Sequence, residues 1–198
     1  QSGLKAASMP ANFGVGTVLR GKTLGIWSYG RIGQLVAGYG RAFGMRVVIW
    51  GSEAARARAV ADGFDVATHK TGFFESVDVL SLHLHLSEAS AGCVSLEDLS
   101  LMKPTALLVN TSRAELIQTE ALLTALNRGR PGIAAIDVFE SEPILQGHAL
   151  LRLENCICTP HIGYVEQDNY ETYFSAAFDD VLNFIKGTPT NVVNPDVL

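Results

Sequence analysis

The chain has 198 residues, of which 47% are hydrophobic and 18% are charged, and its formal net charge at pH 7 is -5. This composition can form a buried core and excludes a disordered tail, and the negative charge gives no general attraction to nucleic acid. No apolar run approaches the roughly 18 residues that a membrane span needs, and we expect no secretion signal. Three cysteines without such a signal indicate reduced thiols and a cytoplasmic protein.

Apolar strands and helices alternate along most of the chain. Residues 1–20 show no regular period and are predicted to be an irregular entry segment. The predicted strands span residues 23–27, 46–50, 64–67, 77–84, 106–110, 132–137 and 155–159. The predicted helices span residues 31–43, 54–62, a short segment between 95 and 104, 120–128 and 166–186. Strands that are apolar on both faces and alternate with helices predict an α/β fold, a doubly wound parallel sheet of about seven strands.

Local signals mark several helix ends. Gly44 and Gly129 follow two predicted helices, as expected of glycines just past a helix end. The segment 95–98 has the pattern of a capping box, and Thr119 is predicted to cap helix 120–128. The small and apolar residues of helix 31–43 are assigned to one face, which includes Ile32, Leu35, Val36 and Tyr39. The apolar side of the last helix consists of Phe174, Phe178, Val181, Leu182 and Ile185.

A glycine-rich turn, Gly25-Ile26-Trp27-Ser28-Tyr29-Gly30-Arg31-Ile32-Gly33, connects the first strand to the first helix. Gly30 would let the backbone approach a pyrophosphate, Gly33 would let the helix pack closely, and the helix N-terminus would attract the phosphates. Ser28 replaces the first glycine of the usual fingerprint. Because the turn follows a strand and opens a helix, it favours dinucleotide binding over glycines used for packing alone. The sequence therefore predicts a Rossmann-type domain whose turn binds a cofactor through Ser28, Gly30, Arg31 and Ile32.

The residue that would choose between NAD and NADP is missing. An acidic residue is expected near the end of the second strand, but Gly51 and Ser52 stand there, followed by Glu53. Without the acid, a 2′-phosphate is not repelled, and Ser52, Arg56 or Arg58 are candidates to contact it. Alternatively, the two arginines are ordinary solvated residues of a helix. Gly51 and Ser52 are predicted to bind the cofactor, and NAD and NADP both remain open.

Three polar segments follow later strands, at the sheet edge where doubly wound folds bind ligands. They are Asn-Thr-Ser-Arg at 110–113, Asp-Val-Phe-Glu-Ser-Glu-Pro at 137–143 and Thr-Pro-His-Ile-Gly at 159–163. Their order behind the glycine turn resembles that of the D-isomer-specific 2-hydroxyacid dehydrogenases, from about Leu19 to the end of the chain. The resemblance implies hydride transfer between NAD or NADP and a small D-2-hydroxy acid or 2-oxoacid.

The resemblance also implies roles for single residues. Arg113 would bind the substrate carboxylate and polarise its carbonyl group, and His161 would be the general acid and base. Glu142 would hydrogen-bond the other ring nitrogen of His161 and favour the protonated imidazole. Each of these residues, taken alone, also fits an ordinary structural role, and their order as a trio favours the catalytic interpretation. Ala114 stands where many members have glycine.

The remaining implied contacts are with the cofactor. Asp137 would touch the nicotinamide carboxamide, and Thr111 and Ser112 would line the pocket. The further residues of this set are His83, Leu84, His85 and Gly163. His83 and His85 alternate across a predicted strand, so at least one of them is expected to be structural.

Cys156 and Cys158 share a strand face just before His161, which raises the question of a metal. No fourth ligand with a recognised spacing accompanies them, so no metal is predicted and both cysteines are assigned to the core.

The resemblance implies that the chain is part of a larger enzyme. We expect residues 21–187 to form the dinucleotide-binding domain and residues 188–198 to return toward an absent substrate domain. The isolated chain would then be inactive. Family members dimerise through their coenzyme domains, with a segment that corresponds to residues 87–101 reaching across, so we expect a homodimer. The expected partners are a small-molecule 2-oxoacid or 2-hydroxyacid, without nucleic acid or membrane.

Two rival functions fit parts of the sequence less well. A non-catalytic NAD(H)-sensing corepressor of the same family keeps the same trio, and reduction of 2-oxoacids by the full-length protein would separate it from an enzyme. A Rossmann methyltransferase has no obvious use for an ordered arginine, glutamate and histidine. The sequence does not name the particular 2-hydroxy acid.

Overall fold

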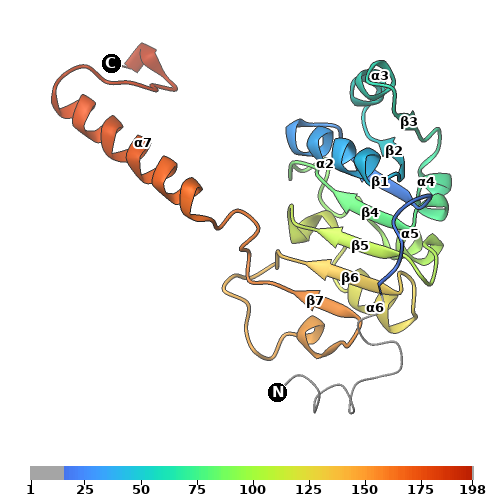
Figure 1. The fold of residues 1–198 in the computed structure, drawn as a ribbon. Coiled ribbons are helices and arrows are strands. Elements are labelled where there is room, and N and C mark those ends of the chain that lie inside the picture. Colours follow the sequence, from blue (N-terminus) through green and yellow to red (C-terminus); the bar gives the residue numbers. More distant parts are fainter. Residues whose placement is uncertain (1–15, 198) are drawn as a thin grey trace, which may run out of the picture. The chain divides into compact units, whose positions relative to one another are not determined.

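The structure, a computed structural model, describes residues 16–197, so residues 1–15 of the predicted entry segment and Leu198 lie outside the described residues. The chain divides into two compact units, residues 1–159 and 160–198. In the first unit the described residues form one sheet of seven parallel strands in the order β3-β2-β1-β4-β5-β6-β7 (Figure 1). This topology confirms the predicted doubly wound α/β fold.

The strands are close to those predicted, with ends trimmed by one or two residues in most cases. They are β1 (Thr23–Trp27), β2 (Arg46–Trp50), β3 (Asp65–Val66), β4 (Val79–Leu82), β5 (Leu107–Asn110), β6 (Ile133–Ile136) and β7 (Cys156–Cys158). The helices of the first unit are α2 (Arg31–Ala42), α3 (Glu53–Ala61), α4 (Lys70–Ser76), α5 (Leu96–Leu101) and α6 (Ala121–Asn127). Two short 3-10 turns, η1 (Ala114–Leu116) and η2 (Ala149–Arg152), complete this unit.

Successive residues of the central strands enter two different cores. Leu24 and Ile26 of β1 pack with Ala37 of α2 and with Ala55 and Ala59 of α3. Trp27, at the end of β1, belongs instead to the core beneath α4, α5 and α6. Because alternate side chains of a strand point to opposite faces, these helices cover both faces of the sheet.

The assignment of one mixed face to α2 was wrong. Gly33, Ala37 and Gly40 are buried, whereas Ile32 and Tyr39 are 65% and 61% exposed. A β-carbon on Gly40 would lie 2.6 Å from Cδ2 of Leu24. The small residues therefore face the sheet because they let the helix approach it closely. Val36 packs against the same core, as predicted, whereas Ile32, Leu35 and Tyr39 point outward.

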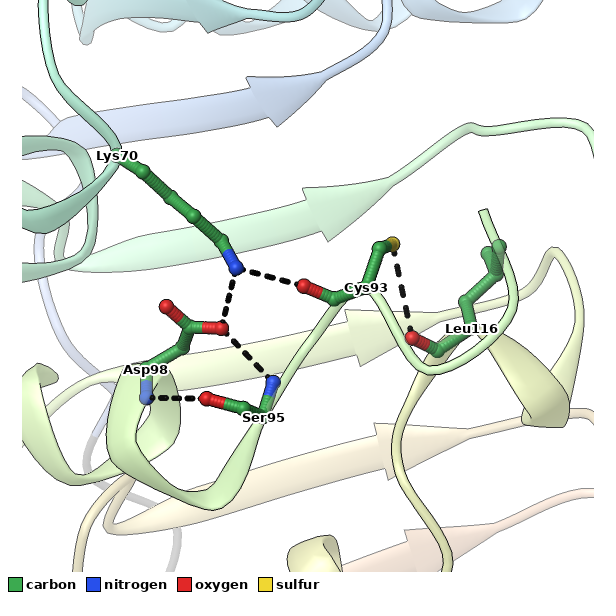
Figure 2. Close-up of polar contacts among 5 residues, drawn as sticks. All are labelled: Lys70, Cys93, Ser95, Asp98 and Leu116. Atoms are coloured by element: carbon green, nitrogen blue, oxygen red, sulfur yellow. Dashed lines mark hydrogen bonds and ion pairs between the residues drawn. The ribbon is translucent and has the colours of Figure 1, made fainter. Parts of the chain in front are cut away.

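A polar cluster holds the start of α5 against α4 (Figure 2). The Asp98 carboxylate accepts from the backbone N–H of Ser95 at 2.8 Å, and the Ser95 hydroxyl accepts from the N–H of Asp98 at 3.2 Å, which confirms the predicted capping box. Lys70 at the start of α4 donates to Asp98 at 2.6 Å and to the Cys93 carbonyl at 2.7 Å. The Cys93 thiol donates to the carbonyl of Leu116, and burial raises the pKa of this thiol. These contacts fix residues 93–98 to their own domain.

Two local predictions around the later helices were wrong. Thr119 does not cap α6, because the N-cap is Glu120, which turns the chain through a left-handed backbone conformation with φ of 63°. The fourth strand ends at Leu82, so His83 and His85 follow the strand rather than alternating across it. The helix α4, which was not predicted, contains Gly72 and has no side-chain cap, and it therefore lacked the usual signals.

The second unit contains the predicted last helix, α7 (Gln167–Ile185), and a final 3-10 turn, η3 (Pro195–Val197). No residue of α7 is buried, and the rings of Tyr170, Phe174 and Phe178 stack in sequence along it. Among the described residues, no helix combines the length and the apolar character needed to cross a membrane.

Candidate functional site

The glycine turn adopts the geometry that the usual fingerprint requires, although a serine occupies its first position. The N–H of Ser28 donates to the carbonyl of Trp50 at 2.8 Å, and Ser28 has a φ of 84°, in the region that favours glycine. A β-carbon on Gly33 would lie 2.4 Å from the carbonyl oxygen of Ser28, whereas one on Gly30 would meet nothing within 4 Å. Gly33 therefore sets the close packing of α2, and the backbone at Gly30 borders open space.

Replacing Ser28 by glycine is expected to raise the free energy of unfolding by about 1 kcal/mol, because glycine adopts a positive φ without steric cost. Chemical denaturation of the 198-residue chain measures this change. Ser28→Ala is the matched control, since it removes the hydroxyl but keeps the β-carbon, and no gain is expected from it. Equal stability of the glycine and alanine variants would contradict backbone strain at this position.

The N-terminus of α2 is suited to hold a pyrophosphate. Gly30 is its N-cap, no side chain caps the helix, and no acidic residue lies in its first turn. Backbone N–H groups of this turn and the positive end of the helix are therefore directed at the open space beside Gly30. Arg31, the first residue of the helix, is exposed.

Two side chains, Arg58 of α3 and Asp62 directly after it, hold the glycine turn through hydrogen bonds to Tyr29. The Tyr29 hydroxyl donates to the Asp62 carboxylate at 2.8 Å, and burial together with this hydrogen bond raises the pKa of Tyr29 to about 12. Arg58 donates to the Tyr29 carbonyl at 3.3 Å. These contacts link the turn to α3 over some thirty positions of sequence.

At the end of β2, the candidate residues for the ribose are partly engaged within the protein. The Ser52 hydroxyl accepts from the N–H of Ala55 at 3.3 Å and so caps α3. Arg56 donates to the Ala67 carbonyl at 3.3 Å and lies over the Trp50 ring. Arg56 and Arg58 thus each donate to a backbone carbonyl, and their contact with a 2′-phosphate stays a prediction.

The segment after β4 contacts the segment after β5. The Ser112 hydroxyl donates to the carbonyl of Leu84 at 2.6 Å, which brings two predicted cofactor-binding residues together. The His83 ring lies 2.9 Å from the hydroxyl of Ser81, and burial lowers the pKa of His83. A partly buried imidazole with a hydrogen-bond partner on β4 fits the structural role that was expected of one of the two histidines, while His85 is exposed.

Asn110 organises the loop that carries Arg113. Its side chain is only 1% exposed; it donates to the carbonyl of Arg113 at 2.8 Å and accepts from the N–H of Ser112 at 3.0 Å. The Arg113 side chain is exposed, and one of its nitrogens donates to the Ser112 carbonyl. No role was predicted for Asn110, although an amide at the end of an apolar strand is a signal for one, because a buried polar group needs hydrogen-bond partners.

The segment after β6 contains the buried carboxylate of Asp137 and the exposed carboxylate of Glu142. Asp137 is 4% exposed, and its carboxylate accepts from the Thr159 hydroxyl at 2.5 Å. The exposed Glu142 accepts from the N–H of Phe139 at 3.0 Å, which closes the turn between the two. Asp137 and Glu142 are thus fixed by backbone and neighbouring side chains of the same unit.

His161 and Gly163 belong to the second unit. His161 has a φ of 55°, and its ring meets the Tyr164 ring edge-on at 5.8 Å between centroids. The hydrogen bond between Glu142 and His161 stays a prediction.

The two cysteines of β7 share a face, as predicted. Their sulfur atoms lie 3.6 Å apart, and burial, with a contribution from Cys158, raises the pKa of Cys156 to about 12. In the part of the chain that the structure describes, no three histidine, cysteine or acidic side chains are grouped in a way that could hold a metal ion.

The parallel sheet and the glycine turn together define a dinucleotide-binding domain. The family model of the D-isomer specific 2-hydroxyacid dehydrogenase, NAD binding domain, matches residues 4–163. The chain therefore belongs to this family and is its NAD-binding domain, which confirms the resemblance inferred from the three polar segments.

Relatives and solved structures agree with this assignment. A glyoxylate reductase from Aeropyrum pernix is 37% identical over 93% of this chain and 55% of its own length. A D-3-phosphoglycerate dehydrogenase from Methanocaldococcus jannaschii is 33% identical over 90% of this chain and 34% of its own length. A crystal structure from Ralstonia solanacearum, provisionally assigned as a D-3-phosphoglycerate dehydrogenase, shares 62% identity and a TM-score of 0.89, covering 98% of this chain and 57% of that one. The chain thus spans about half the length of these relatives, or less.

Proposed function

We propose that this chain is the coenzyme domain of an enzyme that transfers a hydride between NAD or NADP and a small D-2-hydroxy acid or 2-oxoacid. The observation that carries the proposal is the sheet register, in which Asn110 pairs with Ile136 and Ile136 pairs with Cys158. The three polar segments therefore begin side by side at one edge of the sheet, where ligands bind in this class of fold. Relatives named glyoxylate reductase, hydroxypyruvate reductase and phosphoglycerate dehydrogenase carry out reactions of this type.

In this proposal three side chains take part in the reaction, two of them in contact with the substrate. The exposed guanidinium of Arg113, on a loop held by Asn110, binds the substrate carboxylate and polarises the neighbouring carbonyl. His161 donates a proton to the carbonyl oxygen in reduction, or removes it from the hydroxyl in oxidation. Glu142 orients the imidazole of His161 and favours its protonated form. The bound nicotinamide supplies or accepts the hydride.

Further residues are assigned to the cofactor. The open space beside Gly30 and the first-turn N–H groups of α2 suit the pyrophosphate. We assign Ser28, Arg31 and Ile32 to the same turn and Gly51 and Ser52 to the ribose. The nicotinamide end is assigned to Thr111, Ser112, Asp137 and Gly163, and the adenosine end to His83, Leu84 and His85.

The full-length protein that contains this domain tests the proposal. Purified protein is mixed with NADH or NADPH and with glyoxylate or hydroxypyruvate, and loss of the reduced-nicotinamide absorbance is followed. We expect steady reduction by the full-length protein, and cofactor binding without turnover by the 198-residue chain. Cofactor binding without reduction of any 2-oxoacid by the full-length protein would favour the NAD(H)-sensing corepressor instead.

NADP is expected to bind the 198-residue chain at least as well as NAD does, because Gly51 stands where an acid would repel a 2′-phosphate. Calorimetric titration with each cofactor measures the two affinities under one buffer condition. A preference for NAD greater than about tenfold, or 1.4 kcal/mol, would show that Glu53 or another acid binds the ribose hydroxyls.

We further infer that the protein is a cytoplasmic homodimer. The large apolar residues Leu35 and Tyr39 of α2 are exposed, and exposed apolar patches of sufficient area commonly mark contacts with another chain. Light scattering at micromolar concentration is expected to give the mass of a dimer. A monomer under these conditions would remove the inference.

A further inference from the structure

A cavity of about 270 Å³ lies in the first unit, between η1, the start of α6, the end of β6 and η2. This volume is near the lower limit of about 300 Å³ for ligand pockets, and it suits a branched aliphatic or aromatic group rather than a nucleotide. All lining residues belong to the first unit. The proposed function uses none of this space.

The chemistry of the cavity is divided between its floor and its rim. The floor is aliphatic and buried, and it is formed by Ile117, Leu122, Ile136, Val138 and Leu150. The rim carries the exposed side chains of Glu120 and Glu140. Among the described residues that line the cavity, none is a lysine or an arginine. An occupant with an apolar body and a positive end would therefore find both parts complementary, and an anion would be repelled.

His148 also lines the cavity and contacts one of the two rim carboxylates. Its Nδ1 accepts from the N–H of Leu150 at 3.3 Å, and its Nε2 lies 3.7 Å from the Glu140 carboxylate. The imidazole is therefore held in place and directs its second nitrogen toward Glu140. Glu120, the second rim carboxylate, comes from a different element, because it is the N-cap residue of α6.

We propose that this cavity is a binding site for a small primary amine with a branched aliphatic or aromatic body. The apolar body contacts the floor, and the ammonium group lies between the carboxylates of Glu120 and Glu140. The site does not depend on the proposed dehydrogenase function, although one wall is shared with it. Asn110 lines the cavity and also holds the loop of Ser112 and Arg113 through its side-chain amide.

Titration of the isotopically labelled 198-residue chain with isoamylamine tests the proposal, with amide correlation NMR spectra as the readout. We expect saturable shifts confined to residues 110–123 and 136–150, including the amide of Ser112, which bonds to Asn110. Isoamyl alcohol, which has the same body without charge, is expected to bind about fivefold or more weakly, and isovalerate, which carries a negative charge, is expected not to bind. No cofactor is present, so failure here leaves the proposed function untouched.

Two double variants with the same change in net charge show whether isoamylamine contacts the rim carboxylates or responds only to the net charge of the protein. Glu120→Gln/Glu140→Gln is expected to weaken isoamylamine binding about fivefold or more, because both carboxylate contacts are lost. Glu75→Gln/Glu154→Gln removes two exposed carboxylates outside the cavity and is expected to bind like the parent chain. The proposal is wrong if isoamylamine causes no saturable shifts in these segments, if the alcohol binds equally well, or if the two double variants bind alike.

Discussion

Replacing His161 by alanine in the full-length protein is expected to lower turnover with a 2-oxoacid by about 10²–10⁴-fold, the usual contribution of a general acid. The imidazole is the proposed source of the proton that the carbonyl oxygen receives during reduction. Without it, the alkoxide that forms on hydride arrival has to be protonated by water. Steady-state assays of kcat with saturating cofactor and substrate measure the loss.

Two further variants show whether that loss is specific. Glu142→Gln keeps the size of the side chain but removes its charge, and we expect a smaller fall in turnover than for His161→Ala, since the acid itself is retained. His69→Ala removes an exposed histidine that follows β3 and is expected to leave turnover unchanged. Near-normal turnover of the His161 variant would contradict its role as the acid.

Most of the fold could be predicted from the sequence because its signals are local. Apolar runs of four or five residues marked β1, β2 and β5, and glycines with positive φ, such as Gly44 and Gly129, follow the helices that they were expected to end. The orientation of α2 could not be predicted in the same way. Both its small and its large apolar residues have helical spacing, and only the close approach to Leu24 decides that the glycines face the sheet.

In the candidate site too, the local motifs could be predicted from the sequence and the long-range contacts could not. The glycine turn and the three polar segments are short motifs, and their family was recognisable before any contact was known. The contacts that position them join residues distant in sequence, such as Tyr29 with Asp62 and Leu84 with Ser112. No local pattern encodes such a pair. Glu120 was not predicted as the N-cap of α6 for a similar reason. Its left-handed backbone conformation depends on how the chain enters α6 rather than on the conformational preference of glutamate.

Replacing Gly33 by alanine is expected to lower the free energy of unfolding by about 1–3 kcal/mol, in the range for overpacking a filled site. The new β-carbon would lie 2.4 Å from the carbonyl oxygen of Ser28, so the backbone of the turn itself has to move. The same movement displaces the N–H groups at the start of α2, and we expect NAD affinity to fall about tenfold or more. Chemical denaturation and calorimetric titration of the 198-residue chain measure the two effects.

Two other glycines of the same region serve as matched controls, because a β-carbon on either would meet nothing within 4 Å. Gly38→Ala, in the middle of α2, is expected to raise the free energy of unfolding by about 0.5–1 kcal/mol and to leave NAD affinity unchanged. Gly30→Ala is expected to change stability by less than about 0.5 kcal/mol but to weaken NAD binding, since its β-carbon enters the space assigned to the pyrophosphate. A Gly33 variant as stable as the Gly38 variant would contradict the close packing of α2. Unchanged NAD affinity of the Gly30 variant would move the pyrophosphate away from this turn.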